Sequence, residues 1–129
     1  MRVLLDTHSW LWMVGDASRL RESSRRLLRD PANELFLSAA SAWEMAIKFA
    51  SGKLRLPQPP AALITQWMAE VGIGALPILH AHALRAGELP PHHRDPFDRL
   101  LIAQAQIEGL TVLTADRAFA KYDVPVHWA

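Results

Sequence analysis

Short apolar runs alternate along the chain with longer segments whose apolar residues recur at helical spacing. Five runs predict buried strands: Arg2–Leu5, Leu35–Leu37, Ala75–Leu79, Leu110–Leu113 and Val124–Trp128. The third of these contains Pro77, which favours the edge of the sheet. The segments between them predict helices over His8–Gly15, Arg19–Arg29, Ser38 or Ser41 to Gly52, Ala61–Val71, His82–Glu88 and Pro96–Gly109. This alternation favours an α/β fold with three layers, α/β/α, and a mainly parallel sheet of about five strands.

Local signals refine three of these segments. Ser18 precedes the arginine-rich helix and is expected to cap it. Asp95 stands directly before Pro96, which predicts an Asp N-cap followed by Pro at the first helical position. The proline-rich stretch Leu56–Pro60 suits neither a helix nor a central strand, so we expect a linker there.

Length and composition narrow the class of protein. The chain has 129 residues, of which 50% are hydrophobic and 21% are charged, so we expect residues 1–129 to form one folded domain. The absence of cysteine excludes disulfide scaffolds, thiol catalysis and cysteine-ligated zinc or iron–sulfur sites. No apolar run approaches the ~20 residues that cross a bilayer, and the N-terminus lacks signal-peptide features. We therefore expect a cytoplasmic protein without membrane contact.

Four carboxylates stand at positions that a parallel sheet brings to one edge. Asp6 ends the first predicted strand, and Asp116 follows the fourth. Glu44 lies early in the helix after the second strand, and Asp98 lies in the first turn of the helix that begins at Pro96. Ligands of open parallel sheets bind beyond the carboxyl ends of the strands. Like charges gathered there repel one another unless a cation neutralises them, and an oxygen-only set without clustered histidine favours Mg²⁺ or Mn²⁺ over Zn²⁺.

Each acid taken alone also has a structural explanation. Glu44 could complete a capping box with the serine three residues before it, or pair with Lys48. Asp98 could complement the helix dipole, and Asp116 could cap a short turn. Asp6 is harder to explain in this way, because a buried carboxylate at a strand end is costly without a partner.

Four stretches containing these acids carry a resemblance to a known family. They are VLLDTH at 3–8, LSAASAWE at 37–44, DPFDRLLIAQA at 95–105 and VLTAD at 112–116. In their order and spacing the chain resembles the PIN-domain family, and within it the VapC-like toxins of bacterial type II toxin–antitoxin pairs. The resemblance extends over nearly the whole chain. His8 departs from the pattern, because better-known members often have Asn or Ser there.

The resemblance implies a metal-dependent ribonuclease whose five-stranded parallel sheet has the first strand at its centre. By position, the family's acidic quartet corresponds to Asp6, Glu44, Asp98 and Asp116, with Asp98 rather than Asp95 as the third member. We expect Asp6 and Asp98 to be the main metal ligands, Asp116 an outer or second-metal ligand, and Glu44 the residue that orients or deprotonates the attacking water. The expected cofactor is Mg²⁺ or Mn²⁺. The expected partners are an RNA substrate, a cognate antitoxin and a second copy of the chain.

The overall charge is compatible with an RNA substrate. The formal net charge of +1 counts the four acids as negative, so a metal that cancels them would leave a basic surface. Arg94, Arg99 and Arg117 lie near the acids in sequence and are candidate RNA contacts. His92 and His93, in the same loop as Arg94, could join these arginines, although loop histidines without an assigned partner are more often plain surface residues.

Two other classes of protein share parts of this pattern. A phospho-acceptor receiver domain also has an acidic Mg²⁺ pocket. It needs an acid pair near the first strand and an acceptor Asp after the third, and the sequence offers neither. A catalytically silent interaction module with the PIN fold is the second alternative, and the presence of all four acids argues against it.

The tryptophans indicate a surface for a partner protein. An eight-residue helix cannot bury every face of the apolar segment Trp10–Met13, so part of that segment is expected to meet a partner. Trp43 and Trp67 are expected in the core.

Overall fold

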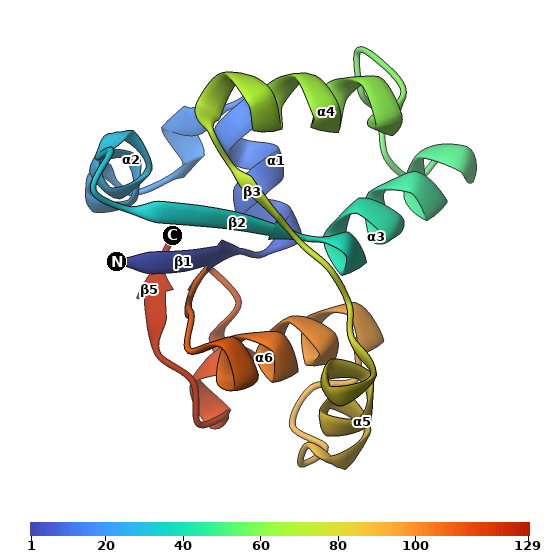
Figure 1. Cartoon of the computed structure of the whole chain (residues 1–129). Coiled ribbons are helices and arrows are strands. Elements are labelled where there is room, and N and C mark those ends of the chain that lie inside the picture. The colour runs from blue at the N-terminus through green and yellow to red at the C-terminus, as the bar shows by residue number, and fades with distance from the viewer.

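One sheet of parallel strands organises the computed structural model, which describes all residues 1–129. Its five strands are β1 (Arg2–Leu5), β2 (Glu34–Ser38), β3 (Gly74–Leu76), β4 (Thr111–Thr114) and β5 (Val126–Trp128). Their order is β3-β2-β1-β4-β5, so β1 lies at the centre and β3 at an edge (Figure 1). The expected α/β class, parallel sheet, central first strand and edge position of the third strand are confirmed.

Helices cover both faces of this sheet. They are α1 (Thr7–Gly15), α2 (Glu22–Arg29), α3 (Ala39–Ala50), α4 (Pro60–Val71), α5 (His80–Glu88) and α6 (Pro96–Glu108), with two 3-10 turns, η1 (Ala17–Arg19) and η2 (Arg117–Lys121). In Figure 1, α1, α2 and α4 lie above the sheet, α5 and α6 lie below it, and α3 projects from the end of β2. None of these helices has both the length and the apolar character that a membrane span requires.

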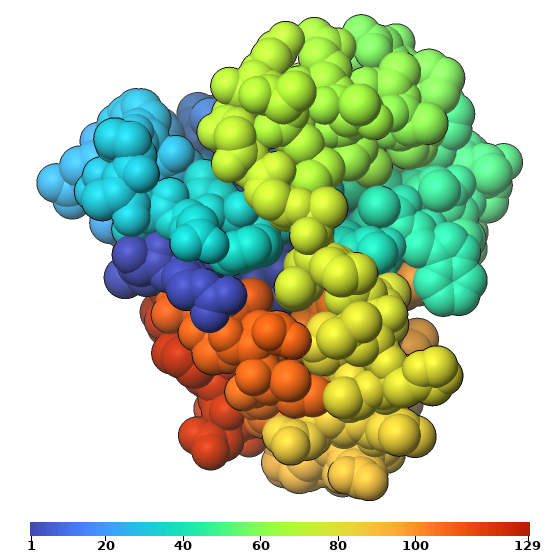
Figure 2. Space-filling view, in the orientation of Figure 1, coloured from blue at the N-terminus to red at the C-terminus, as the bar shows by residue number.

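The core has two halves because successive strand residues point to opposite faces. Val3 and Leu5 of β1 pack in one apolar cluster with Trp10 of α1, whereas Leu4 packs in the other with Leu101 of α6. All five side chains are fully buried. The space-filling view shows the same division, with the green α4 on one side of the molecule and the yellow to red second half on the other (Figure 2). This packing fixes the carboxyl end of β1, where Asp6 stands.

The arginine-rich helix begins later than its sequence suggests. Ser18 does not cap it; the carboxylate of Asp16 instead accepts hydrogen bonds from the backbone N–H and the hydroxyl of Ser18 and caps η1. The chain then runs through the buried Leu20, and α2 starts at Glu22 without a side-chain cap. An aspartate two residues upstream therefore outcompetes the serine as a local hydrogen-bond acceptor.

The tryptophans are distributed differently from the prediction. Trp10 is fully buried, and the other residues of 10–13 are partly buried against the same cluster, as is Trp67. The expectation that Trp43 lies in the core is wrong: its side chain is 61% exposed and meets the ring of Phe97 edge-on, with 5.4 Å between ring centroids. The reason is helical phase, because Glu44, the next residue, turns inward toward the candidate site.

Candidate active site

Asp6 stands at the carboxyl end of the central strand and is buried there. Its Oδ1 accepts the backbone N–H of Ser9 at 2.8 Å, which makes it the N-cap of α1. Its Oδ2 accepts the hydroxyl of Thr114, at the end of β4, at 2.6 Å. Burial raises the pKa of Asp6, and the bonds from Thr114 and Ser9 only partly offset this. The neighbouring strand thus holds both the position and the orientation of this carboxylate.

Glu44 reaches the same edge of the sheet from α3. Its Oε1 accepts the hydroxyl of Thr7 at 2.7 Å, and its Oε2 pairs with the ammonium of Lys48 at 2.6 Å. The hydrogen bond to Glu44 raises the pKa of Lys48, which therefore stays charged. A capping box with Ser41 is wrong, because the helix begins earlier, with Ser38 as its cap. The alternative pairing with Lys48 is confirmed.

Asp95 and Asp98 lie one turn apart but have different partners. Asp95 is the N-cap of α6, with its Oδ1 accepting the backbone N–H of Phe97 at 2.9 Å, and Pro96 follows it as expected. Asp98 points into the cleft, where its Oδ2 lies 3.1 Å from Nε2 of His93. Burial, and next the negative charges of Asp95 and the other three acids, raise the pKa of Asp98 to about 8. Burial is the largest cause of this shift, and the four neighbouring acids add to it.

Asp116 completes the set just after β4. Its Oδ1 accepts the backbone N–H of Ala118 at 3.0 Å and caps η2, while its own N–H donates to the hydroxyl of Thr114 at 3.0 Å. Its Oδ2 lies 2.8 Å from Nε2 of His93. Partial burial raises the pKa of Asp116, but the bonds from Ala118 and His93 outweigh it and hold the pKa below its usual value. Asp98 and Asp116 therefore have pKa shifts of opposite sign.

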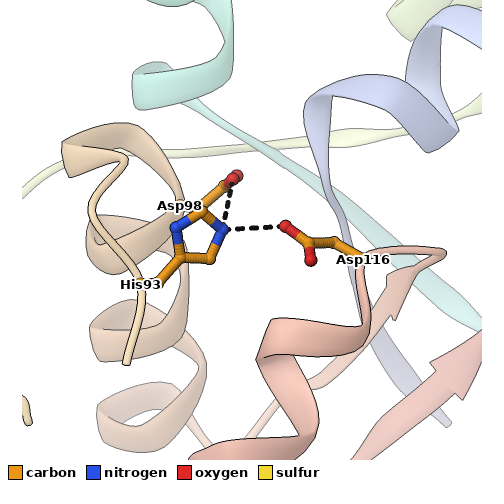
Figure 3. Close-up of side chains that lie close together, drawn as sticks. All are labelled: His93, Asp98 and Asp116. Atoms are coloured by element: carbon orange, nitrogen blue, oxygen red, sulfur yellow. Dashed lines mark hydrogen bonds and ion pairs between the residues drawn. The ribbon is translucent and has the colours of Figure 1, made fainter. Parts of the chain in front are cut away.

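The predictions from the sequence did not include the histidine that lies between these two acids. His93 places Nε2 between Asp98 and Asp116, and ligand atoms of all three residues lie within 4.8 Å of one another (Figure 3). The expectation that no histidine joins the acids, and that His93 is a plain surface residue, is wrong. The signal was its place two residues before the N-cap of α6, from which a short loop must return across the start of that helix.

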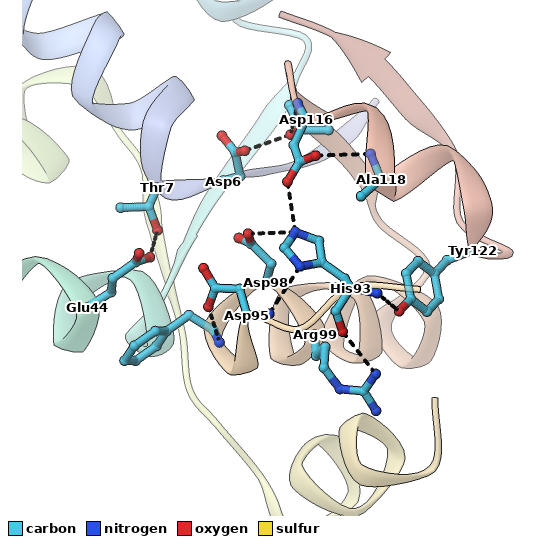
Figure 4. A network of polar contacts seen from close by, with 12 residues as sticks. Asp6, Thr7, Glu44, His93, Asp95, Asp98, Arg99, Asp116, Ala118 and Tyr122 are labelled. Carbon is cyan, nitrogen blue, oxygen red and sulfur yellow. Dashed lines mark hydrogen bonds and ion pairs between the residues drawn. The ribbon is translucent and has the colours of Figure 1, made fainter. Parts of the chain in front are cut away.

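Asp6 and Glu44 stand outside this tight group but face the same cleft. Figure 4 shows Asp6 above Asp98 and beside Asp116, with Glu44 on α3 at the left of the view. Most of the atoms that could bind a metal ion here are carboxylate oxygens. Their negative charges repel one another, and this repulsion contributes to the raised pKa of Asp98. Hard divalent cations bind such oxygen sets and would relieve this repulsion. The residues present therefore fit a metal ion.

The three candidate arginines differ in what they contact. The guanidinium of Arg99 donates to four backbone carbonyls within residues 86–93, at 2.7–3.4 Å, and so ties α5 and the following loop to α6. These internal bonds argue against the RNA contact expected for Arg99. Arg94 is exposed, and Arg117 is exposed with its guanidinium 4.5 Å from the ring centroid of Trp128.

Comparison with curated proteins finds two relatives among bacterial ribonucleases. The chain is 42% identical over 59 residues to Ribonuclease VapC16 of Mycobacterium tuberculosis, a match covering 46% of this chain and 42% of that protein. It is 29% identical over 124 residues to Ribonuclease VapC22 of the same organism, covering 95% and 93% of the two chains. The match thus spans less than half of the first relative and nearly all of the second.

Solved structures share the fold at low sequence identity. DNA-bound VapBC from Salmonella typhimurium superposes with a TM-score of 0.73 at 17% identity, over 98% of this chain and 97% of that one. VapBC2 from Rickettsia felis, bound to a promoter DNA fragment, gives 0.74 at 15% identity over the whole of both chains. The family model described as PIN domain matches residues 3–125. The chain therefore belongs to the PIN-domain family.

Proposed function

We propose that this chain is a metal-dependent endoribonuclease and the toxin of a toxin–antitoxin pair. The observation that carries the proposal is the convergence of four carboxylates at the carboxyl ends of β1 and β4 and on the facing helices, in a chain of the PIN-domain family. The names of the two curated relatives, both VapC ribonucleases, support RNA as the substrate. An activity on cellular RNA requires a cytoplasmic location, which the proposal includes.

The chemistry follows from what each residue holds. A bound Mg²⁺ or Mn²⁺ would supply an acidified water and neutralise charge on the scissile phosphate. Asp98 and Asp116 provide facing carboxylates for the ion, and Asp6, locked by its two hydrogen bonds, provides the third. Glu44 stands across the cleft, fixed by Thr7 and Lys48, and orients the water or takes its proton. Of the candidate arginines, Arg94 and Arg117 stay in the proposal as RNA contacts.

The receiver-domain alternative is disfavoured by topology. Receiver domains have the strand order 2-1-3-4-5, with the third strand inside the sheet. In this chain β3 lies at the edge and β1 is flanked by β2 and β4. The silent interaction module remains the rival, since it shares the fold and differs only in activity.

An antitoxin segment is the proposed occupant of a groove of about 670 Å³ between α1, α3 and α4. Its lining includes the apolar side chains of Trp12, Leu63 and Trp67, and Lys48 lies at the end next to Glu44. A peptide lying in this groove would reach the acids. The VapBC complexes among the structural neighbours support an antitoxin as the partner. If a small antitoxin-like protein is encoded next to this chain, co-expression with it should give a complex that no longer cleaves RNA.

A second copy of the chain is also part of the proposal. Large apolar side chains are exposed on α3 and around the start of α5: Trp43, Ile47, Leu79 and Leu84. Both helices project on the right-hand side in Figure 1. Light scattering coupled to gel filtration should give the mass of a dimer, and Leu84→Asp, at a side chain 68% exposed, should give the mass of a monomer.

Cleavage of RNA tests the proposed activity. The purified chain should cut RNA with Mg²⁺ or Mn²⁺, and EDTA should abolish cleavage. Undiminished cleavage in the chelator would remove the metal mechanism. A protein that binds Mn²⁺ but leaves every RNA intact would instead favour the silent module.

A further inference from the structure

We propose that His93 is a positioning residue of the candidate metal site. Its Nε2 proton is donated to Asp116 and lies beside Asp98, at ion-pair distance, and so His93 sets the spacing of these two carboxylates without itself binding the ion. The inference rests on the proposed function, because it concerns the metal that the function requires. The inference gives His93 a role at the site, whereas the sequence offered no partner for its side chain.

The first argument is the tautomer of the ring. The backbone N–H of Asp95 points at Nδ1 of His93, with 3.1 Å between the nitrogens. A backbone N–H can only donate, so Nδ1 must accept and carries no proton. The proton of the neutral ring therefore sits on Nε2, facing both carboxylates at 2.8 and 3.1 Å. A nitrogen that carries a proton has no lone pair for a metal.

The second argument is that the ring cannot easily turn to offer a lone pair. The backbone N–H of His93 donates to the hydroxyl of Tyr122 at 2.8 Å, and that hydroxyl donates to the carbonyl of Pro90 at 2.7 Å. Arg99 bonds the carbonyls of the same loop, and the ring of Phe119 stands perpendicular to the imidazole, 6.0 Å between centroids. A ring flipped about its Cβ–Cγ bond would set the Cδ2–H group against the N–H of Asp95, which would lose its acceptor, and would turn Cε1–H toward the two carboxylates.

The third argument is what the Nε2 proton does to its neighbours. Asp98 comes from α6 and Asp116 from the segment after β4, and no other group bonds both carboxylates. The imidazole stands between the two carboxylates and holds Oδ2 of each within 3.1 Å of Nε2, which fixes their separation. Groups that hydrogen-bond metal ligands in this way fix ligand geometry, and their loss typically weakens metal binding about 10–100-fold.

Pulsed electron paramagnetic resonance of the Mn²⁺-loaded wild-type protein separates the two possible roles of His93. A directly bound imidazole nitrogen gives a strong ¹⁴N coupling. We expect no such coupling, because the Nε2 proton points at carboxylate oxygens. A strong coupling that disappears in His93→Ala would make His93 a ligand and overturn the inference. This measurement needs no activity and uses the intact chain.

Mn²⁺ titrations of variants measure the positioning itself. His93→Ala should bind Mn²⁺ about 10–100-fold more weakly than wild type. His93→Gln should stay within a few-fold, since its side-chain amide can place an N–H near the position of Nε2. His92→Ala is the matched control: it lies in the same loop, is exposed and touches Tyr122 edge-on, and should bind like wild type. Melting curves of all four proteins check that each is folded.

The outcomes separate this inference from the proposed function. Wild-type protein that binds no Mn²⁺ would overturn both. Wild-type protein that binds Mn²⁺ while His93→Ala binds it equally well would overturn the positioning role alone and leave the nuclease proposal intact. Should His93→Ala fail to fold, His93→Gln and the wild-type spectrum still decide. A His93→Gln variant that binds Mn²⁺ about 10-fold or more weakly than wild type would contradict the inference.

Discussion

The two ends of helix α6 carry the same pairing of histidine with carboxylate. At its C-terminal end, Glu108 lies 2.9 Å from Nε2 of His82, and Nδ1 of that ring accepts the backbone N–H of Leu79 at 3.0 Å. At its N-terminal end, His93 repeats the arrangement with the backbone N–H of Asp95. In both places a backbone donor fixes the tautomer, and the ring turns its Nε2 proton to an acid.

The difference lies in how many acids each ring meets. His82 meets one carboxylate, and the pair closes a contact between α5 and α6. His93 meets two carboxylates from different elements, and further acids surround them. An imidazole–carboxylate pair is therefore not itself a sign of function. The surplus of negative charge that the histidine does not cancel is what distinguishes the candidate site.

The largest expected effect comes from removing one charge at each end of the helix. Asp98→Asn should lower RNA cleavage by about 100-fold or more, because an amide cannot neutralise a metal ion, while the fold is kept. Glu108→Gln should cleave RNA like wild type. Initial cleavage rates with Mn²⁺ give the comparison, and equal losses in the two variants would show that the two ends are not functionally distinct.

Removing the two histidine rings should affect stability more at the C-terminal end of α6, at His82, than at the N-terminal end, at His93. His82→Ala should lower the free energy of unfolding by about 2–4 kcal/mol, because a ring only 1% exposed leaves a cavity and an unpaired N–H. It should leave Mn²⁺ affinity unchanged. His93→Ala should cost less than about 1.5 kcal/mol, since water can enter the cleft. Urea unfolding with EDTA present measures both, and a larger loss for His93→Ala would contradict the structural assignment of His82.

The surplus charge itself should be visible in the pH dependence of stability without metal. The pKa of Asp98 is about 8 in the folded chain, against an ordinary value of 3.8, so the folded chain holds the extra proton between these values. Its contribution to stability is complete at low pH and is lost as pH rises through about 8. In EDTA, Asp98→Asn should therefore melt about 3 °C or more above wild type near pH 9, and the gain should shrink toward pH 6. A difference that does not change with pH would mean that neither burial nor the neighbouring acids raise the pKa of Asp98.

The smallest effects are expected at the helix cap. Asp95→Asn should keep most activity and stability, because Asn caps about as well as Asp. Asp95→Ala should lower stability by roughly 0.5–2 kcal/mol, with activity falling only as far as the start of α6 is disturbed. Cleavage and melting of both variants beside Asp98→Asn give the check. Loss of cleavage in Asp95→Asn but not in Asp98→Asn would exchange the roles of the two acids.

Much of the fold could be predicted because its signals are local. The Asp95-Pro96 start of α6, the glycine at 109 that ends it in a left-handed conformation and the β-branched strand runs each specify structure within a few residues. The central position of β1 did not follow from such signals and came from the resemblance, and the rest of the strand order was predicted only in the edge position of β3. The start of α2 was missed because a 3-10 turn capped by Asp16 takes up residues 17–19, and α2 then begins at Glu22 without a side-chain cap that the sequence could show.

The candidate site was predictable in its acids but not in what surrounds them. Carboxylates after strand ends are visible in the sequence, because the sheet brings those ends together. Asp6 accepts hydrogen bonds from the hydroxyl of Thr114 on β4 and from the backbone N–H of Ser9 on α1. These donors lie on different elements, and the Thr114 hydroxyl carries no sequence signal of its own. His93 was missed for the same reason, because its direction depends on a bond that it donates to Tyr122 and one that it accepts from Asp95, and both form only in the folded loop.

The central position of β1 makes Asp6 depend on groups that come much later in the chain. Thr114, on the flanking strand β4, follows Asp6 by 108 residues, so it leaves the ribosome well after β1. Until the chain has emerged past residue 116, Asp6 has no Thr114 to orient it and the candidate site has no Asp116. A nascent chain that lacks β4 therefore cannot assemble the four acids. The strand order places completion of the candidate site, and of the cleavage proposed for it, after β4 has joined β1.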